Sequence, residues 1–224
     1  MRFLLAALAL TGLAAPAWAH APAAQTAPSP DLDRLVGLLV PDATMLDLAM
    51  KGVEGSTPPA DIAALYAQNQ GMKAYVEAQL RPEMQRLLQR ELPALRSEIR
   101  TILVAELTPA EITDTATFFG SPTGQKLYAA AIGSIAGSSE ADEARARSAA
   151  INAAMASLQR EDYPALMAFG ASSASNKMKS VNPRVGAASK AWAARLIAEN
   201  SAPMQALQRR AIGDFQKNKQ GETQ

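Results

Sequence analysis

The sequence predicts an all-α protein, a helical bundle with one tight αα-hairpin at residues 108–135. Three observations lead to this fold class. Apolar residues recur at three- and four-residue steps over most of the chain, as they do along one face of a helix. No segment alternates as a strand would, and the composition is dominated by helix-favouring Ala, Leu, Gln, Arg and Glu. Two helix starts with almost no loop between them predict the hairpin.

The first nineteen residues have the pattern of a secretory signal peptide. Met1 and Arg2 give a short charged start, residues 3–13 an apolar core, and residues 17–19 a small-x-small cleavage site. We expect cleavage after Ala19 and a periplasmic location. The apolar run is shorter than the ~20 residues that span a bilayer, so the mature chain is not expected to cross a membrane.

Residues 20–30 are rich in Ala and Pro and predict a flexible linker. A helical domain is expected over residues 31–170. It opens with three short helices, one from Asp31 that stops at Pro41, one around residues 45–49, and one that begins near Asp61.

The longest periodic stretch predicts a long amphipathic helix. Its apolar stripe consists of Leu80, Met84, Leu87, Leu88, Leu95, Ile99, Ile102 and Leu103. Pro82 and Pro93 interrupt the pattern, because proline lacks the N–H that an inner helical turn needs. We therefore expect kinks, or a division into two segments.

The hairpin is predicted from its capping residues. Thr108 can act as N-cap, Pro109 suits the first helical position, and Glu111 completes a capping box. Gly120 is expected to end this helix in the left-handed conformation, and Ser121 followed by proline starts the next helix.

Three further segments complete the chain. Ser139 is a predicted N-cap for a helix whose apolar side includes Ile151 and Met155. Residues 171–186 are rich in Ser, Asn, Gly and Lys, and we expect a mobile loop. Residues 187–219 predict a C-terminal helix or helices, divided at Pro203.

Composition excludes several kinds of chemistry. The chain has no cysteine and one histidine, His20, so disulfides, a thiolate nucleophile, a lipidated cysteine and a histidine-based catalytic dyad are excluded. We expect no cofactor and no metal. Charge is uneven: residues 20–170 carry 12 basic and 18 acidic side chains, whereas residues 171–224 carry 9 and 3. The basic end could contact anionic lipid headgroups or dock on the acidic part, and nucleic acid is not expected.

The hairpin carries a resemblance to a known family. Glu106 to Glu111 (ELTPAE) followed by Phe118 to Lys126 (FFGSPTGQK) resembles the signature of the bacterial domain-of-unknown-function family 2059, over about residues 95–160. Phe119 stands where that signature often has tyrosine. The resemblance implies export and a helical fold, and it brings no activity. The candidate interaction or structural-motif residues are Phe118, Phe119, Ser121, Pro122, Gly124, Gln125 and Lys126.

Two roles are open for these residues. Three residues separate Gly120 from Gly124 and no Ser or Thr follows Lys126, so the segment is not a nucleotide-binding P-loop. The helix start at Ser121 could bind an anion, or it could serve as a cap beside a glycine that lets two helices approach closely. Likewise, Phe118, Phe119 and Tyr128 could form core or line a ligand site.

The function expected from the sequence is a non-enzymatic binding or interaction module of the cell envelope. Its partner would be an envelope protein or an anionic lipid headgroup. One alternative is an envelope hydrolase that uses paired carboxylates, for which Glu106 and Glu111 are candidates. The other is a carrier of a small hydrophobic ligand. The remaining acidic pairs, such as Glu161 with Asp162, stand at predicted helix starts, where the helix dipole favours them.

Overall fold

The computed structural model describes residues 29–55, 57–135 and 143–221, and this part of the chain is all-α with no strand. Its helices are α1 (Pro30–Leu39), α2 (Asp42–Gly55), α3 (Ala60–Gln68), α4 (Met72–Glu106), α5 (Pro109–Gly120), α6 (Pro122–Ile135), α7 (Glu143–Ser157), the 3₁₀ turn η2 (Arg160–Asp162), α8 (Tyr163–Gly170) and α9 (Ser173–Gly221). The predicted fold class and the αα-hairpin, formed by α5 and α6, are confirmed. The predicted signal peptide, residues 20–28 of the linker and the cap at Ser139 lie outside the described residues.

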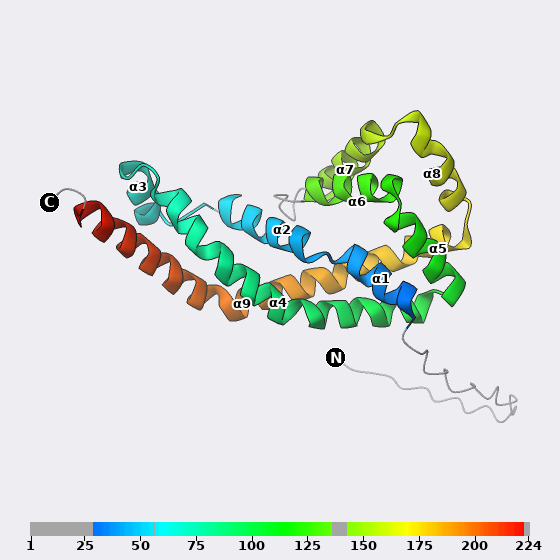
Figure 1. Ribbon diagram of the computed structural model, residues 1–224, viewed down its shortest axis with the longest axis horizontal. Coiled ribbons are helices and arrows are strands. Elements are labelled where there is room, and N and C mark those ends of the chain that lie inside the picture. Colours follow the sequence, from blue (N-terminus) through cyan, green and yellow to red (C-terminus); the bar gives the residue numbers. More distant parts are fainter. Residues whose placement is uncertain (1–28, 56, 136–142, 222–224) are drawn as a thin grey trace, which may run out of the picture.

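Two long helices, α4 and α9, form the scaffold. They lie side by side over much of their length, and α1 and α2 pack on α4 (Figure 1). The α3 helix lies at the end of the molecule where α9 finishes, whereas α6, α7 and α8 form an arm at the other end (Figure 1). The hairpin helix α5 joins this arm to the scaffold through contacts with α1 and α9.

Except for Leu80, the predicted stripe on α4 lies in the main hydrophobic core. Every residue of that stripe is buried, and α4 buries eleven side chains in all. The partners include Leu35 on α1, Met50 on α2, Ile112 on α5 and Trp192 on α9. A second, smaller cluster joins the start of α4 to the end of α9 through residues such as Met72 and Ile212.

Prolines do not divide the long helices. Of the two outcomes left open for α4, kinks or a division, the division does not occur, and the predicted division at Pro203 is wrong. Pro82 and Pro93 lie inside α4, and Pro183 and Pro203 lie inside α9. Figure 1 shows that α4 and α9 each bend along their length and continue. An inner proline costs roughly 3 kcal/mol, while each large apolar side chain buried on α4 stabilises the fold by about 1.5–3 kcal/mol. Burial therefore outweighs the local cost.

The prediction of a mobile loop at residues 171–186 is wrong, because α9 is continuous from Ser173. Its polar residues hide a helical pattern of small and medium apolar side chains, and Ala174, Met178 and Val181 are all buried. Ser172 caps the helix, its Oγ accepting the backbone N–H of Ser175 at 3.1 Å. Tertiary burial, which composition does not reveal, orders this segment.

The predicted conformation of Gly120 is also wrong. Gly120 is the last residue of α5, and Gly71, at the start of α4, is the glycine with a positive φ among the described residues. The chain turns at Ser121 instead, which is extended, with φ −78° and ψ 158°. Since α6 begins at once, no left-handed residue is needed. No helix in the described ranges has the length and hydropathy to cross a bilayer.

Candidate functional site

The candidate residues of the signature build the corner between α5 and α6. Ser121 Oγ accepts the backbone N–H of Gly124 at 3.1 Å and donates to the Phe118 carbonyl oxygen at 2.6 Å. Pro122 occupies the first turn of α6, and the Gln125 side-chain amide donates to the Phe119 carbonyl oxygen. Ser121 is therefore the predicted helix cap, and the polar groups of the corner bind one another.

At Gly124, the start of α6 lies directly against the backbone of α5. A Cβ placed on this residue would lie 2.0 Å from the Phe118 carbonyl oxygen and 2.8 Å from the Phe119 Cα. Both are backbone atoms, which cannot move aside as the end of a side chain could. Glycine is thus required here by space, in agreement with the structural role that the sequence left open for it.

The two phenylalanines of the signature lie in a ring cluster with Phe169 of α8. Phe118 is buried and stacks on Phe169, with ring centroids 4.1 Å apart and planes 4° from parallel. Phe119 contacts both rings edge-on, at 5.5 and 6.2 Å. The cluster holds α8 against the hairpin, so these rings serve as core instead of lining a cavity.

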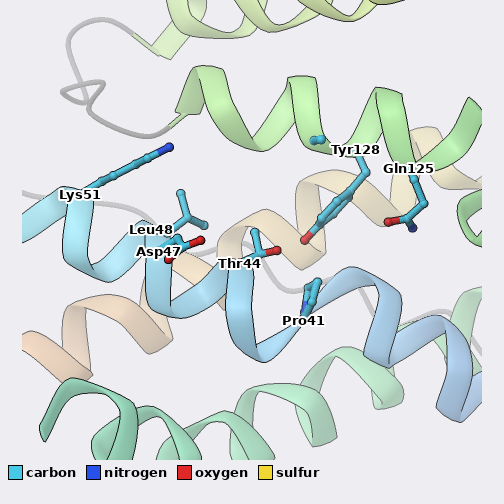
Figure 2. Close-up of a pocket in the computed structure, with 8 residues that line it drawn as sticks. Pro41, Thr44, Asp47, Leu48, Lys51, Gln125 and Tyr128 are labelled. Carbon is cyan, nitrogen blue, oxygen red and sulfur yellow. The ribbon is translucent and has the colours of Figure 1, made fainter. Parts of the chain in front are cut away.

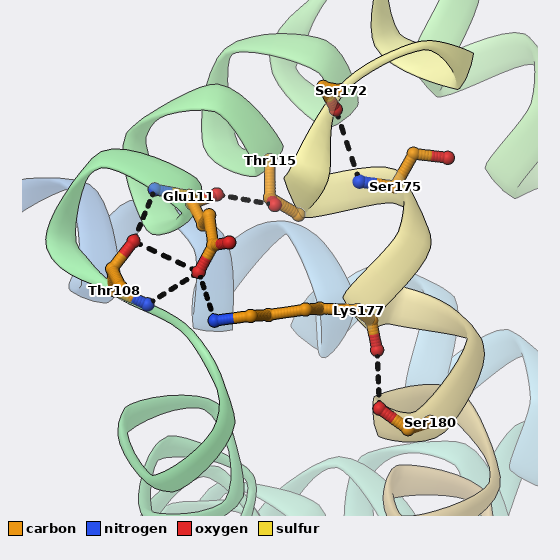
Figure 3. Close-up of polar contacts among 7 residues, drawn as sticks. All are labelled: Thr108, Glu111, Thr115, Ser172, Ser175, Lys177 and Ser180. Atoms are coloured by element: carbon orange, nitrogen blue, oxygen red, sulfur yellow. Dashed lines mark hydrogen bonds and ion pairs between the residues drawn. The ribbon is translucent and has the colours of Figure 1, made fainter.

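Glu111 is a buried carboxylate that joins the hairpin to α9 (Figure 3). Its Oε2 accepts the Thr108 N–H at 2.8 Å, which completes the predicted capping box, and it also binds the Lys177 Nζ at 2.8 Å. The Lys177 ammonium, followed by the Thr108 N–H, lowers the pKa of Glu111 to about 2. Glu111 is therefore ionised at neutral pH.

Asp162 forms a second buried site of the same kind. It accepts the Gln159 N–H at 2.9 Å, the Thr123 hydroxyl at 2.8 Å and the Lys126 Nζ at 2.9 Å. The Gln159 N–H, with the Lys126 ammonium next, lowers the pKa of Asp162 to about 2. The signature lysine thus binds a carboxylate 36 residues away. Sequence reasoning saw Asp162 only as a helix-start residue and gave no signal for this pair.

The acidic pair proposed for hydrolysis, Glu106 and Glu111, is held in ion pairs with α9. Glu106 pairs with Arg184 of α9, just as Glu111 pairs with Lys177. These two ion pairs join the acidic part, residues 20–170, to the basic part, residues 171–224, as the uneven charge predicted. A general acid needs a raised pKa, whereas the pKa of Glu111 is lowered. Across the described ranges, no three His, Cys, Asp or Glu side chains gather to hold a metal ion.

Beside the corner, a hollow of about 320 Å³ lies between α2 and α6 (Figure 2). Its lining residues are Pro41, Thr44, Asp47, Leu48 and Lys51 on the α2 side, and Gln125, Tyr128 and Ala129 on α6. The Tyr128 hydroxyl donates to the Leu39 carbonyl oxygen at 2.8 Å, and burial raises the pKa of Tyr128 to about 12. The ring is thus a fixed, neutral wall of the hollow.

Comparison with known proteins gives a match to a family model. Residues 93–183 match the model of a family described as an uncharacterized protein conserved in bacteria (DUF2059). The match covers 91 of the 224 residues, less than half of the chain. The resemblance expected from the signature is confirmed, and the match extends beyond residue 160 into α9. No curated protein and no solved structure shows a significant match to the chain.

The DUF2059 segment begins inside one long helix and ends inside the other. It runs from Pro93 in α4 to Pro183 in α9 and holds both buried carboxylates with their lysines. It also supplies the α6 wall of the hollow, whereas the α2 wall lies outside it. The part of α9 beyond Pro183, with most of its exposed basic residues, is likewise outside the segment.

Proposed function

We propose that this protein is a non-enzymatic binding module of the bacterial cell envelope, exported through a cleaved signal peptide, that attaches to anionic lipid headgroups through α9. The proposal depends on one difference among the basic side chains of α9: some form ion pairs inside the fold and others do not. Lys177 and Arg184 bind carboxylates of the hairpin region. In contrast, Arg195, Arg209 and Lys217 are exposed, and no ion pair or hydrogen bond joins them to other described residues.

These three residues share one side of the helix. Arg209 and Lys217 are eight residues apart, slightly more than two helical turns, and Arg195 precedes Arg209 by fourteen, close to four turns. The buried residues Ala211 and Ile212 of the same stretch belong to the cluster with α4. The basic side therefore faces solvent while another side of α9 is packed.

The expected binding is weak and depends on salt. Each Lys or Arg near an anionic membrane surface contributes about 1 kcal/mol, so three give roughly 3 kcal/mol. Screening at physiological ionic strength acts over about 8 Å and reduces this attraction. A surface of this strength suits reversible attachment, or attachment that is reinforced by a second contact.

Sedimentation with phosphatidylglycerol vesicles at low salt tests the lipid part of the proposal. We expect the mature protein to pellet with these vesicles, to remain in solution with phosphatidylcholine vesicles, and to be released as salt rises. The variant R209E/K217E should lose most of the pelleting. The control R160E/K179E makes the same change in net charge at two exposed residues, one in η2 and one in the second turn of α9, and should keep the pelleting.

Three results would contradict this assignment: no pelleting with the anionic vesicles, equal pelleting with both lipids, or the same loss in the control variant. Export is tested separately. Expression of the full chain in a Gram-negative host and mass spectrometry of the periplasmic fraction should find a protein that begins at His20. A full-length cytoplasmic product would contradict the signal peptide.

A further inference from the structure

We propose that the hollow between α2 and α6 is a binding site for a small organic carboxylate, with Lys51 as its anion-binding group. The site is distinct from the basic side of α9 and does not depend on it. Figure 2 shows the Lys51 side chain extending from α2 toward α6, and the Tyr128 ring crossing between the two helices at the other end.

Contacts outside the hollow fix the positions of its two walls, so the hollow stays open. On one side, Arg96 of α4 donates to the Val40 carbonyl oxygen at 2.7 Å and binds Asp42 at 2.9 Å, which fixes the start of α2. On the other side, the corner at Gly124 fixes the start of α6. The bond from Tyr128 to the Leu39 carbonyl oxygen then sets the spacing between the two.

Charge in the lining favours an anion. Asp47 lies 3.6 Å from Arg81 of α4, so its negative charge is already balanced by a cation outside the hollow. Lys51 is exposed and has no ion-pair partner among the described residues. Among the lining residues and the Arg81 that pairs with Asp47, one positive charge is therefore left over, on Lys51, one helical turn from Asp47.

The rest of the lining favours an anion that carries an apolar organic group. Leu48, Pro41 and Ala129 are apolar, and Tyr128 presents its ring, while the Thr44 hydroxyl can bind a second oxygen. The volume of about 320 Å³ is at the lower end of known ligand sites, which fits a molecule of one ring or a short chain. An inorganic anion would leave the apolar wall unused.

Titration of ¹⁵N-labelled protein with benzoate, followed by NMR, tests the site. Benzylamine has the same ring with a positive charge, and inorganic phosphate has charge without a ring. We expect benzoate, and neither of the others, to shift the backbone amides of residues 44–51 and 125–129. A charge-assisted contact with Lys51 predicts that Lys51→Gln weakens benzoate binding about tenfold or more, whereas Lys217→Gln on α9 leaves it unchanged.

A second variant tests the cavity independently of charge. Ala129→Leu, on an exposed position of α6, should fill the hollow and abolish the benzoate shifts while the circular dichroism spectrum stays the same. The proposal is overturned if benzoate shifts none of these amides, if benzylamine or phosphate gives the same shifts, or if Lys51→Gln or a folded Ala129→Leu binds benzoate as the wild type does.

Discussion

The indole Nε1 of Trp192 in α9 donates a hydrogen bond to the backbone carbonyl oxygen of Glu91 in α4, over 3.2 Å. The two residues are 101 positions apart in sequence. Glu91 precedes Pro93 by two residues, in the middle of α4, so the bond joins the two long helices close to one of the inner prolines. Trp192 is 5% exposed, and its ring belongs to the main core.

Removing this hydrogen bond should weaken the pairing of the long helices. Trp192→Phe keeps an aromatic ring in the core and loses the N–H donor, and we expect the free energy of unfolding to fall by about 1 kcal/mol. Trp192→Ala also removes the ring and should cost about 3–5 kcal/mol. Urea denaturation followed by circular dichroism measures both. Equal stability of wild type and Trp192→Phe would show that the bond contributes nothing.

The corner between α5 and α6 should tolerate a methyl group at one glycine and reject it at the other. Gly124→Ala places a Cβ against the Phe118 backbone, and such overpacking typically costs about 1–3 kcal/mol. At Gly120 a Cβ meets only the guanidinium end of Arg34, which can swing away. We expect Gly120→Ala to stay within about 0.5 kcal/mol of wild type. Thermal denaturation of the two variants side by side decides the point, and a harmless Gly124→Ala would refute the close contact.

The helical state of residues 173–186 can be tested by a stabilising substitution. Gly186 is inside α9, and a Cβ there would meet nothing within 4 Å. In a helix, Gly186→Ala should raise the free energy of unfolding by about 0.5–1 kcal/mol. Hydrogen exchange should also show protected amides from Lys177 to Lys190. Fast exchange there, together with no gain from Gly186→Ala, would restore the mobile loop that composition predicted.

Stability should fall in acid because of the two buried carboxylates. The pKa of Glu111 is lowered from 4.5 and that of Asp162 from 3.8, both to about 2 in the folded protein. A lowered folded-state pKa stabilises the fold above the unfolded value, and this contribution is lost as pH falls toward 2. We expect the Tm to be steady near neutral pH and to drop below about pH 5.

Substitution of Glu111 tests how much of the loss of stability in acid comes from this residue. Glu111→Gln should lower the Tm at neutral pH, and its difference from wild type should shrink as pH falls from 4.5 toward 2. Glu161→Gln, on an exposed neighbour of Asp162, is the matched control and should follow the wild-type curve. A Glu111→Gln curve parallel to wild type at every pH would contradict the role assigned to this ion pair.

Truncation should cost much more stability at one residue of α8 than at another. Phe169 stacks on Phe118, so Phe169→Ala should cost about 3 kcal/mol, the lower end for phenylalanine because the ring is only half-buried. Met167 lies two residues earlier and is 71% exposed. Met167→Ala should change stability by no more than about 0.5 kcal/mol. Chemical denaturation compares the two variants, and similar losses would mean that α8 packs differently.

Local signals in the sequence were sufficient for much of the fold. The stripe from Leu80 to Leu103, the capping box of Thr108 and Glu111, and the cap at Ser121 all depend on residues within about four positions of one another, the range over which a helix forms its own contacts. The signature was found in the same way. Its pairing with Asp162 was not, because nothing within one or two turns reveals a partner 36 residues away.

What the sequence determined by itself was therefore the all-α class, the hairpin and the resemblance of its signature to the DUF2059 family. Only the tertiary structure decided that Pro183 and Pro203 lie inside one helix, that α9 already begins at Ser173, and that Lys51 and Tyr128 line a common hollow. Each of these features depends on the free energy of contacts between residues that are far apart in sequence. Burial against α4 and ion pairs with the hairpin outweigh the local preference of proline, glycine and serine against helix.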